Sequence, residues 1–344
     1  MVLEIDSSRG EGGGQMVRTS VALATLTGTT TRLTRIRENR PTNGLSKQHT
    51  TAVNAISQMT GSKITGNHIG SSELLVEPGD SQVPELSLDI GTAGSISLVI
   101  QATLLAARDY KERFTLDLKG GTNVMWAPPI DTYSMVLFPL MERMGIHASV
   151  DIIQRGFYPI GGGEAKVTLE PMGRIKPLVL DTLGEFKGIH GLCFIQHLSD
   201  RIGYDMMDAC KKVFNGKYDL DIEFQRCEGT SRGAGMVLVA EYENGLLSSN
   251  VLSSKGHSPQ QSGLDVASEL LQEMSSGSTI DIHTADQLLP YMAMAEGKSS
   301  FIVSRISKHL LSQMDTLESF LDVRFGVERK DDGYHFSVTP GAYQ

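Results

Sequence analysis

An internal repeat constrains the fold of this chain more than any other feature of its sequence. Three alternating segments are each stopped by a proline, which suits the end of a strand because proline cannot donate a hydrogen bond to a neighbouring strand. A predicted helix, a turn and a short strand precede each segment. The segments span 72–79, 164–171 and 335–341, and the helices before them are predicted at about 48–60, 131–144 and 309–321.

The openings of the three units match as well. In the first two units a glycine-containing turn precedes an apolar helix, and in the third a polar turn does so. The turns are 12–15, 91–95 and 283–287, and the helices after them are 16–26, 96–107 and 288–295. Each second helix leads into a glycine, at Gly61, Gly145 or Gly326. A unit is therefore predicted to run strand, loop, helix, strand, helix, strand, strand over about 90 residues.

The third unit is too long, and its surplus predicts an inserted domain. About 170 residues separate Pro171 from Pro340, roughly 80 more than one unit needs. We assign the insert to residues 181–276 and the three repeats to residues 1–180 plus 277–344. The predicted elements of the insert are strands at 188–197, 220–227, 236–242 and 247–253 and helices at 203–214 and 258–274. An Asn-Gly turn joins the last two strands, so the insert is a small α/β unit.

Composition and charge limit the classes of protein to which this chain can belong. The chain has 344 residues, of which 40% are hydrophobic and 21% charged, as in an ordinary globular protein. Its net charge of −9 argues against a protein that coats nucleic acid through a general basic surface. Residues 29–49 nevertheless hold five basic side chains against one acidic side chain. This patch indicates either a confined polyanion site, such as a nucleotide or an RNA end, or a solvated strand edge.

Cysteine usage and hydropathy favour a reducing compartment. Cys193, Cys210 and Cys227 lie far apart and no CxxC motif occurs, so we expect neither a metal cluster nor a disulfide framework. No apolar run approaches the ~20 residues that span a bilayer, and we find no secretion signal. We therefore expect a cytoplasmic protein without a membrane segment.

The stretch 9–15 carries the first functional indication, because four glycines fall within five of its positions. A predicted strand at 2–6 precedes it and a helix follows it. This geometry cradles phosphate, since unpaired backbone N–H groups and the helix dipole both face the anion. Glu11 would repel phosphate unless a divalent cation lay between them, so we expect Glu11 to bind Mg²⁺ or Mn²⁺. The alternative is a tight turn with a solvated glutamate.

Three arginines are predicted to lie around this loop. Arg18 belongs to the first helix, whereas Arg37 and Arg40 leave a strand predicted at 33–37 and enter a loop. The planar guanidinium group suits phosphate oxygens, and several together would balance the charge of a triphosphate. For these three we favour a functional role over plain surface exposure.

Later segments give weaker indications. Pro128 and Pro129 have flat apolar faces that could cover a purine, or they form a turn before the next helix. Asp286 is expected to cap a helix. His309 opens a helix and is either a nucleophile or a structural histidine. No GxxxxGK[ST], HExxH or GxSxG motif occurs, so any ATP must bind by another route.

An ordered series of motifs resembles RNA 3′-terminal phosphate cyclases along essentially the whole chain, the insert included. The motifs are 10–15 with Arg18, Arg37-x-x-Arg40 with Gln48-His49, 91–95 with Gln101, 156–163, 283–287 and 309–311. The run 283–295 looks more like the archaeal branch of the family than the bacterial one. The resemblance implies an α/β (α+β) fold of three βαβαββ units, which form the catalytic domain, with an inserted domain of thioredoxin-like topology.

The resemblance also implies a ligase-type reaction with three steps. His309 Nε2 attacks the α-phosphorus of ATP and gives a covalent histidine–AMP and pyrophosphate. AMP then moves to the RNA 3′-phosphate and gives an RNA(3′)pp(5′)A end. The neighbouring 2′-OH finally attacks the 3′-phosphorus, which releases AMP and leaves a 2′,3′-cyclic phosphate. For the insert, contact with RNA and contact between subunits of a homo-oligomer both stay open.

The same resemblance assigns residues to the ATP site. His309 is the implied catalytic residue, and Glu11 is the implied ligand of Mg²⁺ or Mn²⁺. The side chains matched to phosphate are Arg18, Arg37, Arg40 and Gln48. The residues matched to the adenosine pocket are Gln101, Pro128, His283, Thr284, Ala285, Asp286 and Gln287. Among these, His283 and Pro128 are implied to sandwich the base.

Three other hypotheses belong to different classes of function. A cyclase-like protein that has lost catalysis and serves ribosome assembly, as a scaffold or nuclease, should lack His309 and the arginines, all of which are present here. An enolpyruvyl transferase of a distantly similar fold needs no adenylylated histidine. A simple RNA-end-binding module is disfavoured by the net charge of −9.

Overall fold

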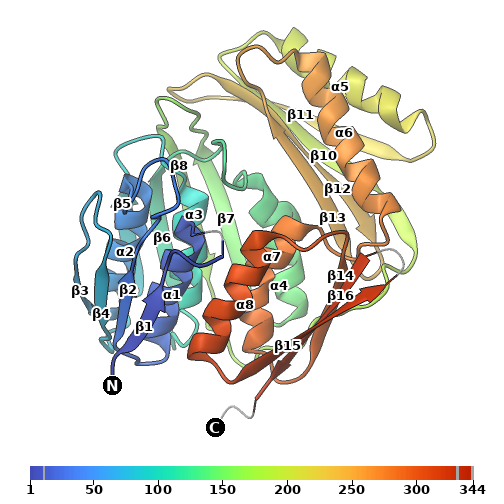
Figure 1. Ribbon diagram of the computed structural model, residues 1–344. Helices are drawn as coiled ribbons and strands as arrows, with labels where there is room; N and C mark the ends of the chain where they lie inside the picture. The colour runs from blue at the N-terminus through green and yellow to red at the C-terminus, as the bar shows by residue number, and fades with distance from the viewer. Residues whose placement is uncertain (11, 331–332, 342–344) are drawn as a thin grey trace.

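Four mixed sheets of four strands each organise the computed structural model, which describes residues 1–10, 12–330 and 333–341. Eight α-helices and one π-helical segment accompany them in the described part of the chain. The helices of the first three sheets gather at the centre of the molecule (Figure 1). The predicted mixed α/β class is confirmed.

The first sheet has the order β1-β2-β4-β3, and β1 is parallel to β2 while the other pairs are antiparallel. Its strands are β1 (Leu3–Asp6), β2 (Thr31–Thr34), β3 (Lys63–Thr65) and β4 (Leu74–Glu77). Its helices are α1 (Gly14–Leu26) and α2 (Lys47–Thr60). Almost every residue of α1 is buried, which fits a helix that is covered on all sides.

The second sheet repeats this order as β5-β6-β8-β7, again with only its first pair parallel. Its strands are β5 (Glu85–Asp89), β6 (Phe114–Gly120), β7 (Ala148–Gln154) and β8 (Gly163–Leu169). Its helical segments are α3 (Ile96–Ala106), the π-helical η1 (Tyr133–Leu137) and α4 (Phe138–Arg143). The single helix predicted at 131–144 thus opens with a π-turn, because Pro139 offers no N–H to the preceding turn.

The third sheet has the same order a third time, β9-β14-β16-β15, with β9 and β14 parallel. Its strands are β9 (Val179–Leu180), β14 (Ser299–Val303), β15 (Val323–Lys330) and β16 (Gly333–Pro340). Its helices are α7 (Ile282–Ala293) and α8 (Lys308–Phe320). Helix α8 packs against both α1 and α7, so helices of the first and third sheets meet directly.

The fourth sheet lies in the chain between β9 and α7 and has the order β11-β10-β12-β13. Its strands are β10 (Phe186–Gln196), β11 (Leu220–Cys227), β12 (Gly233–Tyr242) and β13 (Leu246–Leu252). Its helices, α5 (Asp200–Phe214) and α6 (Pro259–Ser275), cover the face turned away from the other sheets (Figure 1). Both faces of the sheet are buried, since Cys193 and Ile195 pack among the helices while Phe194 joins the central core.

Three local predictions were wrong, each for a physical reason. The strand predicted at 33–37 ends at Thr34, because Arg35 and Arg37 adopt positive φ angles of 52° and 56°. Helix α7 begins at Ile282 rather than at 288, because the Asp281 carboxylate accepts hydrogen bonds from the first backbone N–H groups. Gly326 lies within β15 and does not end a helix.

The described helices include none that is long and apolar enough to cross a membrane.

Candidate active site

A cavity of about 550 Å³ lies where helices of the first three sheets meet. The starts of α1, α2 and α8 line it with α3, α7 and η1, together with the loops around 37–40 and 126–128. Ser248 and Asn250 of β13 add a wall from the fourth sheet. Most of the residues proposed from the sequence face this one space. They are Arg18, Arg37, Arg40, Gln48, Gln101, Pro128, His283, Thr284, Asp286, Gln287 and His309.

Two of the proposed residues fall outside this set. Ala285 is fully buried and does not line the cavity, so its side chain supports the wall from behind. Glu11, the proposed metal ligand, lies outside the described residues. Within the described ranges no group of three or more His, Cys, Asp and Glu side chains is arranged to hold a metal ion.

His309 stands at the start of α8 and contacts Gln15 at the start of α1. Ser307 caps this helix through a hydrogen bond from the Leu310 backbone N–H to its Oγ, at 2.9 Å. The His309 Nδ1 atom lies 2.6 Å from Gln15 Oε1. Because an amide oxygen only accepts hydrogen bonds, Nδ1 is the donor in this contact, and Gln15 thereby fixes the orientation of the ring.

The glycine loop lies beside the same helix. A Cβ atom on Gly10 would stand 2.1 Å from Ser312 Oγ on α8, which leaves room for glycine alone. Helix α1 begins at Gly14 after Gly13, and among the described residues no side chain caps it and its first turn holds no acidic residue. This helix start lines the cavity together with His309, and the N-terminus of a helix favours an anion.

His49 packs against the start of α1. A Cβ atom on Gly14 would fall 1.9 Å from His49 Nε2, so the ring occupies the space that a side chain would need. The Ser46 N–H donates to His49 Nδ1 at 3.1 Å, which leaves the proton of the neutral ring on Nε2. Burial and the nearby positive charges of Arg18 and Arg37 lower the pKa of His49 to about 3, so the ring is neutral at pH 7.

The arginines form a cationic wall. Arg18 is buried and its Nη2 donates to Gln101 Oε1 at 3.4 Å. The Arg37 Nη1 donates to the Gly44 carbonyl at 2.8 Å. Burial and the charge of Arg40 lower the pKa of Arg37, so these two neighbouring cations repel each other. A bound polyanion would relieve that repulsion.

Asp286 links two helices rather than capping one. Its carboxylate accepts a hydrogen bond from Ser307 Oγ, the cap of α8, at 3.1 Å. The cap of α7 is Asp281, which accepts from the backbone N–H groups of His283 and Thr284 at 3.1 and 2.9 Å. Asp286 thereby connects α7 to the residues that begin α8 and carry His309. The prediction that Asp286 caps a helix was wrong.

Another part of the cavity lining is suited to a base. Pro128 and His283 line it, and Gln287 Nε2 donates to the His283 carbonyl at 3.2 Å. The Gln287 Oε1 atom is buried and has no hydrogen-bond partner within the described structure. An orphaned acceptor of this kind is suited to a donor on a ligand. Gln48 lies elsewhere in the wall, where its Oε1 accepts from the Ser95 N–H at 3.3 Å.

Comparison with known proteins adds the family to this geometry. A family model described as RNA 3′-terminal phosphate cyclase matches residues 9–327. The chain belongs to the RNA 3′-terminal phosphate cyclase family. Relatives carrying that name include a protein of Methanococcoides burtonii, 37% identical over 98% of this chain and all of the relative. Another, from Caldivirga maquilingensis, is 38% identical over 98% of both chains, and one from Nitrosospira multiformis is 37% identical over 95% and 94%.

Sequence reasoning missed the role of Gln15 in this cyclase-family cavity. It stands in the glycine motif, but no role was assigned to it, because its partner His309 lies 294 positions away in the chain. Trp126 and Gln313 also line the cavity without having been singled out. The signal for Gln15 was its place at the start of a helix next to a phosphate-type loop.

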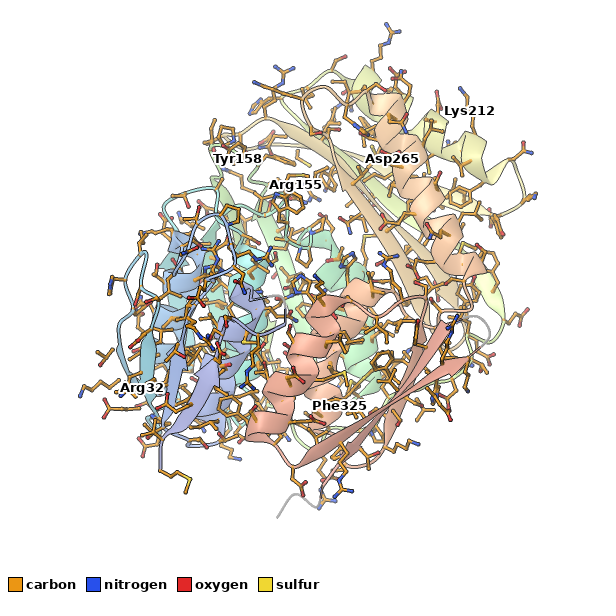
Figure 2. The ribbon with its side chains drawn as sticks, in the orientation of Figure 1. Arg32, Arg155, Tyr158, Lys212, Asp265 and Phe325 are labelled. Carbon is orange, nitrogen blue, oxygen red and sulfur yellow. The ribbon has the colours of Figure 1, made fainter. Side chains whose placement is uncertain are left out.

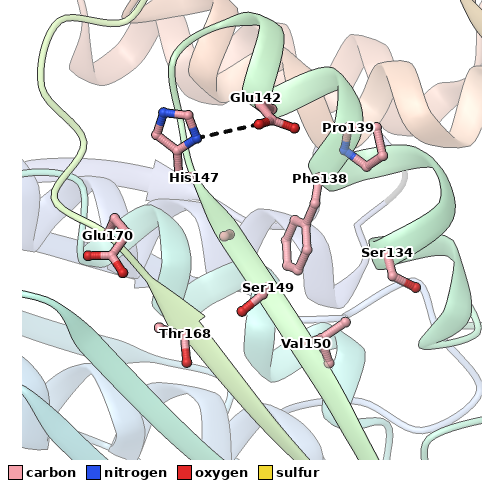
Figure 3. Close-up of a pocket in the computed structure, with 10 residues that line it drawn as sticks. Ser134, Phe138, Pro139, Glu142, His147, Ser149, Val150, Thr168 and Glu170 are labelled. Atoms are coloured by element: carbon pink, nitrogen blue, oxygen red, sulfur yellow. Dashed lines mark ion pairs between the residues drawn. The ribbon is translucent and has the colours of Figure 1, made fainter.

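A second cavity, of about 410 Å³, lies between α4, β7 and β8 (Figure 3). Its polar side chains include Glu142, His147 and Glu170, and His147 Nδ1 lies 3.8 Å from Glu142 Oε1. Two carboxylates disfavour a phosphate ligand, and none of the residues proposed from the sequence lines this space. The 550 Å³ cavity therefore remains the candidate active site of this cyclase-family protein.

Proposed function

We propose that this protein converts an RNA 3′-terminal phosphate to a 2′,3′-cyclic phosphate in an ATP-dependent reaction through a covalent histidine–AMP. One observation carries the proposal: His309 lies in the same cavity as the end of the glycine loop and three arginines. The printed names of the relatives, RNA 3′-terminal phosphate cyclase, support the overall reaction.

In the first step His309 Nε2 attacks the α-phosphorus of ATP. The new N–P bond forms as the bond to the bridging oxygen breaks, and pyrophosphate leaves with that electron pair. The imidazole becomes positively charged in this step. Its Nδ1 proton stays in the hydrogen bond to Gln15, whose carbonyl dipole stabilises that charge.

The charges around the cavity support binding of the triphosphate. The backbone N–H groups at the start of α1 and the side chains of Arg18, Arg37 and Arg40 would neutralise phosphate oxygens. We propose that Glu11 holds Mg²⁺ or Mn²⁺ beside the phosphates, where the cation supplies further charge neutralisation. Gln48, at the junction of α2 and α3, completes the phosphate side.

The adenosine is proposed to occupy the end with the orphaned acceptor. Gln287 Oε1 would accept a hydrogen bond from the exocyclic amino group of adenine. Pro128 and His283 would cover the two faces of the base. Gln101, Thr284 and Asp286 line the same space, and Ala285 would support it from behind.

The later steps need no second nucleophile from the protein. An oxygen of the RNA 3′-phosphate attacks the phosphorus of histidine–AMP, and His309 leaves with the electron pair of the N–P bond. The 2′-OH then loses its proton and attacks the 3′-phosphorus, which expels AMP and closes the ring. The arginine wall would neutralise the phosphates in both steps.

We also propose the domain organisation that the resemblance to the cyclases implies. We infer that residues 1–180 plus 277–344 form a catalytic domain of three repeats, since three sheets share one strand order and one parallel first pair. Residues 181–276 are inferred to be an insert of thioredoxin-like topology, supported by the order β11-β10-β12-β13 with β10 and β11 parallel. The Ser248 and Asn250 side chains in the cavity wall support contact between this insert and the substrates.

A labelling experiment tests the proposal. The protein is incubated with Mg²⁺ and α-labelled ATP in the absence of RNA. We expect covalent label that survives alkali and is lost in acid, as a phosphoramidate should be, and we expect none in His309→Ala. His147→Ala, at an exposed histidine outside the cavity, is the matched control and should label like the wild type. A wild-type protein that takes up no label would contradict the proposal.

A further inference from the structure

Trp126 combines two properties that rarely occur together. It is the only tryptophan of the chain and it is 95% exposed to solvent, although it also lines the cavity that contains His309. Tryptophan is among the side chains with the most apolar surface and is highly buried on average. A fully exposed indole at the edge of a cavity therefore points to a ligand that covers it.

The backbone holds the indole in this exposed position. Trp126 has a φ angle of 68°, which bulky side chains rarely adopt. The ends of its loop are closed by a hydrogen bond from the Ile130 N–H to the Thr122 carbonyl, at 3.1 Å. Such a conformation persists only where the surrounding structure enforces it.

A buried polar network fixes the base of this loop. Asn123 Nδ2 donates to Asp131 at 3.0 Å, and Arg155 donates to both carboxylate oxygens of Asp131 at 2.7 and 2.6 Å. Arg155 in turn donates to Gln225 of the fourth sheet at 2.8 Å. The loop is therefore anchored to both the second and the fourth sheet, and Arg155 lies at their junction (Figure 2).

Successive residues of this loop differ in exposure: some form the wall of the cavity and Trp126 forms its rim. Ala127 and Pro128, which follow Trp126, are half-buried and line the cavity. Trp126 itself stands at the rim. Under the proposed function the nucleotide lies inside, beside His309 and the arginines, so the RNA 3′ end must approach from the rim.

We propose that Trp126 stacks on the base of the 3′-terminal nucleotide of the RNA and thereby positions its 3′-phosphate over His309. The inference rests on the proposed function and adds a residue that binds the second substrate. Stacking on an indole tolerates every base because each has a π-face, so Trp126 would favour a single-stranded end without selecting its sequence. The adenine of ATP is the other nucleobase source, but the buried Gln287 Oε1, which has no partner among the described residues, offers it an acceptor that the exposed Trp126 does not.

Tyr158 provides a matched control. It is an aromatic residue that is 76% exposed, on the loop that pairs with the Trp126 loop through a bridge between Asn123 and Phe157. Unlike Trp126, it does not line the cavity. It lies at the surface close to Arg155 (Figure 2).

Because the chain has a single tryptophan, its fluorescence reports on this position directly. The full-length protein is titrated, without ATP, with a short single-stranded RNA that ends in a 3′-phosphate. We expect the RNA to change the emission strongly, and an RNA whose last nucleotide is abasic to change it little. A larger change with ATP alone than with the RNA would assign the indole to the nucleotide and overturn the inference.

Steady-state kinetics with two variants complete the test. Trp126→Ala should raise the KM for RNA about ten-fold or more, the size of one base–aromatic stacking contact, with a smaller effect on kcat. Trp126→Phe should recover much of this loss, and Tyr158→Ala should match the wild type. An unchanged KM for RNA in Trp126→Ala, or a rise in the KM for ATP instead, would overturn the inference.

The two proposals fail in different ways. If the wild type takes up no label from ATP but its fluorescence still responds to the base of the RNA end, the proposed reaction fails and the stacking site stands. If labelling succeeds and the fluorescence does not respond to RNA, the stacking site fails and the proposed reaction stands.

Discussion

The hydrogen bond between Gln15 and His309 gives the sharpest prediction for catalysis. Gln15→Met keeps the length and helix preference of the side chain but removes the strong acceptor for the His309 Nδ1 proton. A hydrogen bond between neutral groups contributes about 0.5–1.5 kcal/mol. If that stabilisation is expressed in the transition state, adenylylation should slow by about 2- to 12-fold, since 1.36 kcal/mol corresponds to ten-fold. The short distance of 2.6 Å favours the upper end of this range.

The assay is the single-turnover rate of label transfer from α-labelled ATP at saturating ATP, without RNA. Gln15→Glu retains an acceptor and should be faster than Gln15→Met. Gln313→Met is the matched control, because this side chain lines the same cavity and accepts from the Thr19 hydroxyl at 3.1 Å rather than from His309. Labelling of Gln15→Met at the wild-type rate would refute the role of this hydrogen bond in adenylylation.

Three further predictions concern the phosphate side of the cavity. Gly14→Ala places a Cβ against His49 and should destabilise the fold by about 1–3 kcal/mol in denaturant unfolding, so a neutral effect would contradict the packing described for α1. The pKa of His49 is about 3 in the folded protein and 6.5 in the unfolded chain, so its contribution to folding stability is complete above pH 6.5 and is lost as the pH falls. Between pH 7 and 5 the free energy of unfolding should fall by about 2 kcal/mol more in the wild type than in His49→Gln. Equal losses would count against a buried neutral ring. Glu11→Ala should weaken the dependence of labelling on Mg²⁺ without unfolding the protein, and an unchanged dependence would remove Glu11 from the site.

Local elements were predictable where sequence signals were local. The strand predicted at 220–227 has those bounds as β11, and the helix predicted at about 48–60 differs from α2 by a single residue. The alternating segments that end at a proline likewise predicted β4, β8 and β16. Such signals depend on neighbouring residues, which the sequence displays directly.

Features that depend on tertiary contacts were not predictable in this way. The pairing of Gln15 with His309 requires α1 to pack against α8, and no pattern along the chain encodes that contact. The exposed position of Trp126 depends on a loop anchored by Asp131 and Arg155. The start of α7 was a missed local signal, since Asp281 stands three residues before Thr284 in the manner of a helix cap.

The residues predicted for an ATP site rest on a resemblance, and the structure gathers most of them around one cavity. Periodicity and composition alone suggested the glycine loop and three arginines, while the roles of Gln101 and His283 had no separate physical signal. Both kinds of residue line the same space, which is the arrangement that a shared triphosphate requires.

Peptide mapping by mass spectrometry tests the central claim most directly. The protein is incubated with ATP and Mg²⁺, digested at alkaline pH to preserve a phosphoramidate, and searched for AMP-bearing peptides. The account predicts one AMP per chain, attached to the imidazole of His309. AMP attached to a different residue, or a His309 peptide that never carries it, would contradict the account.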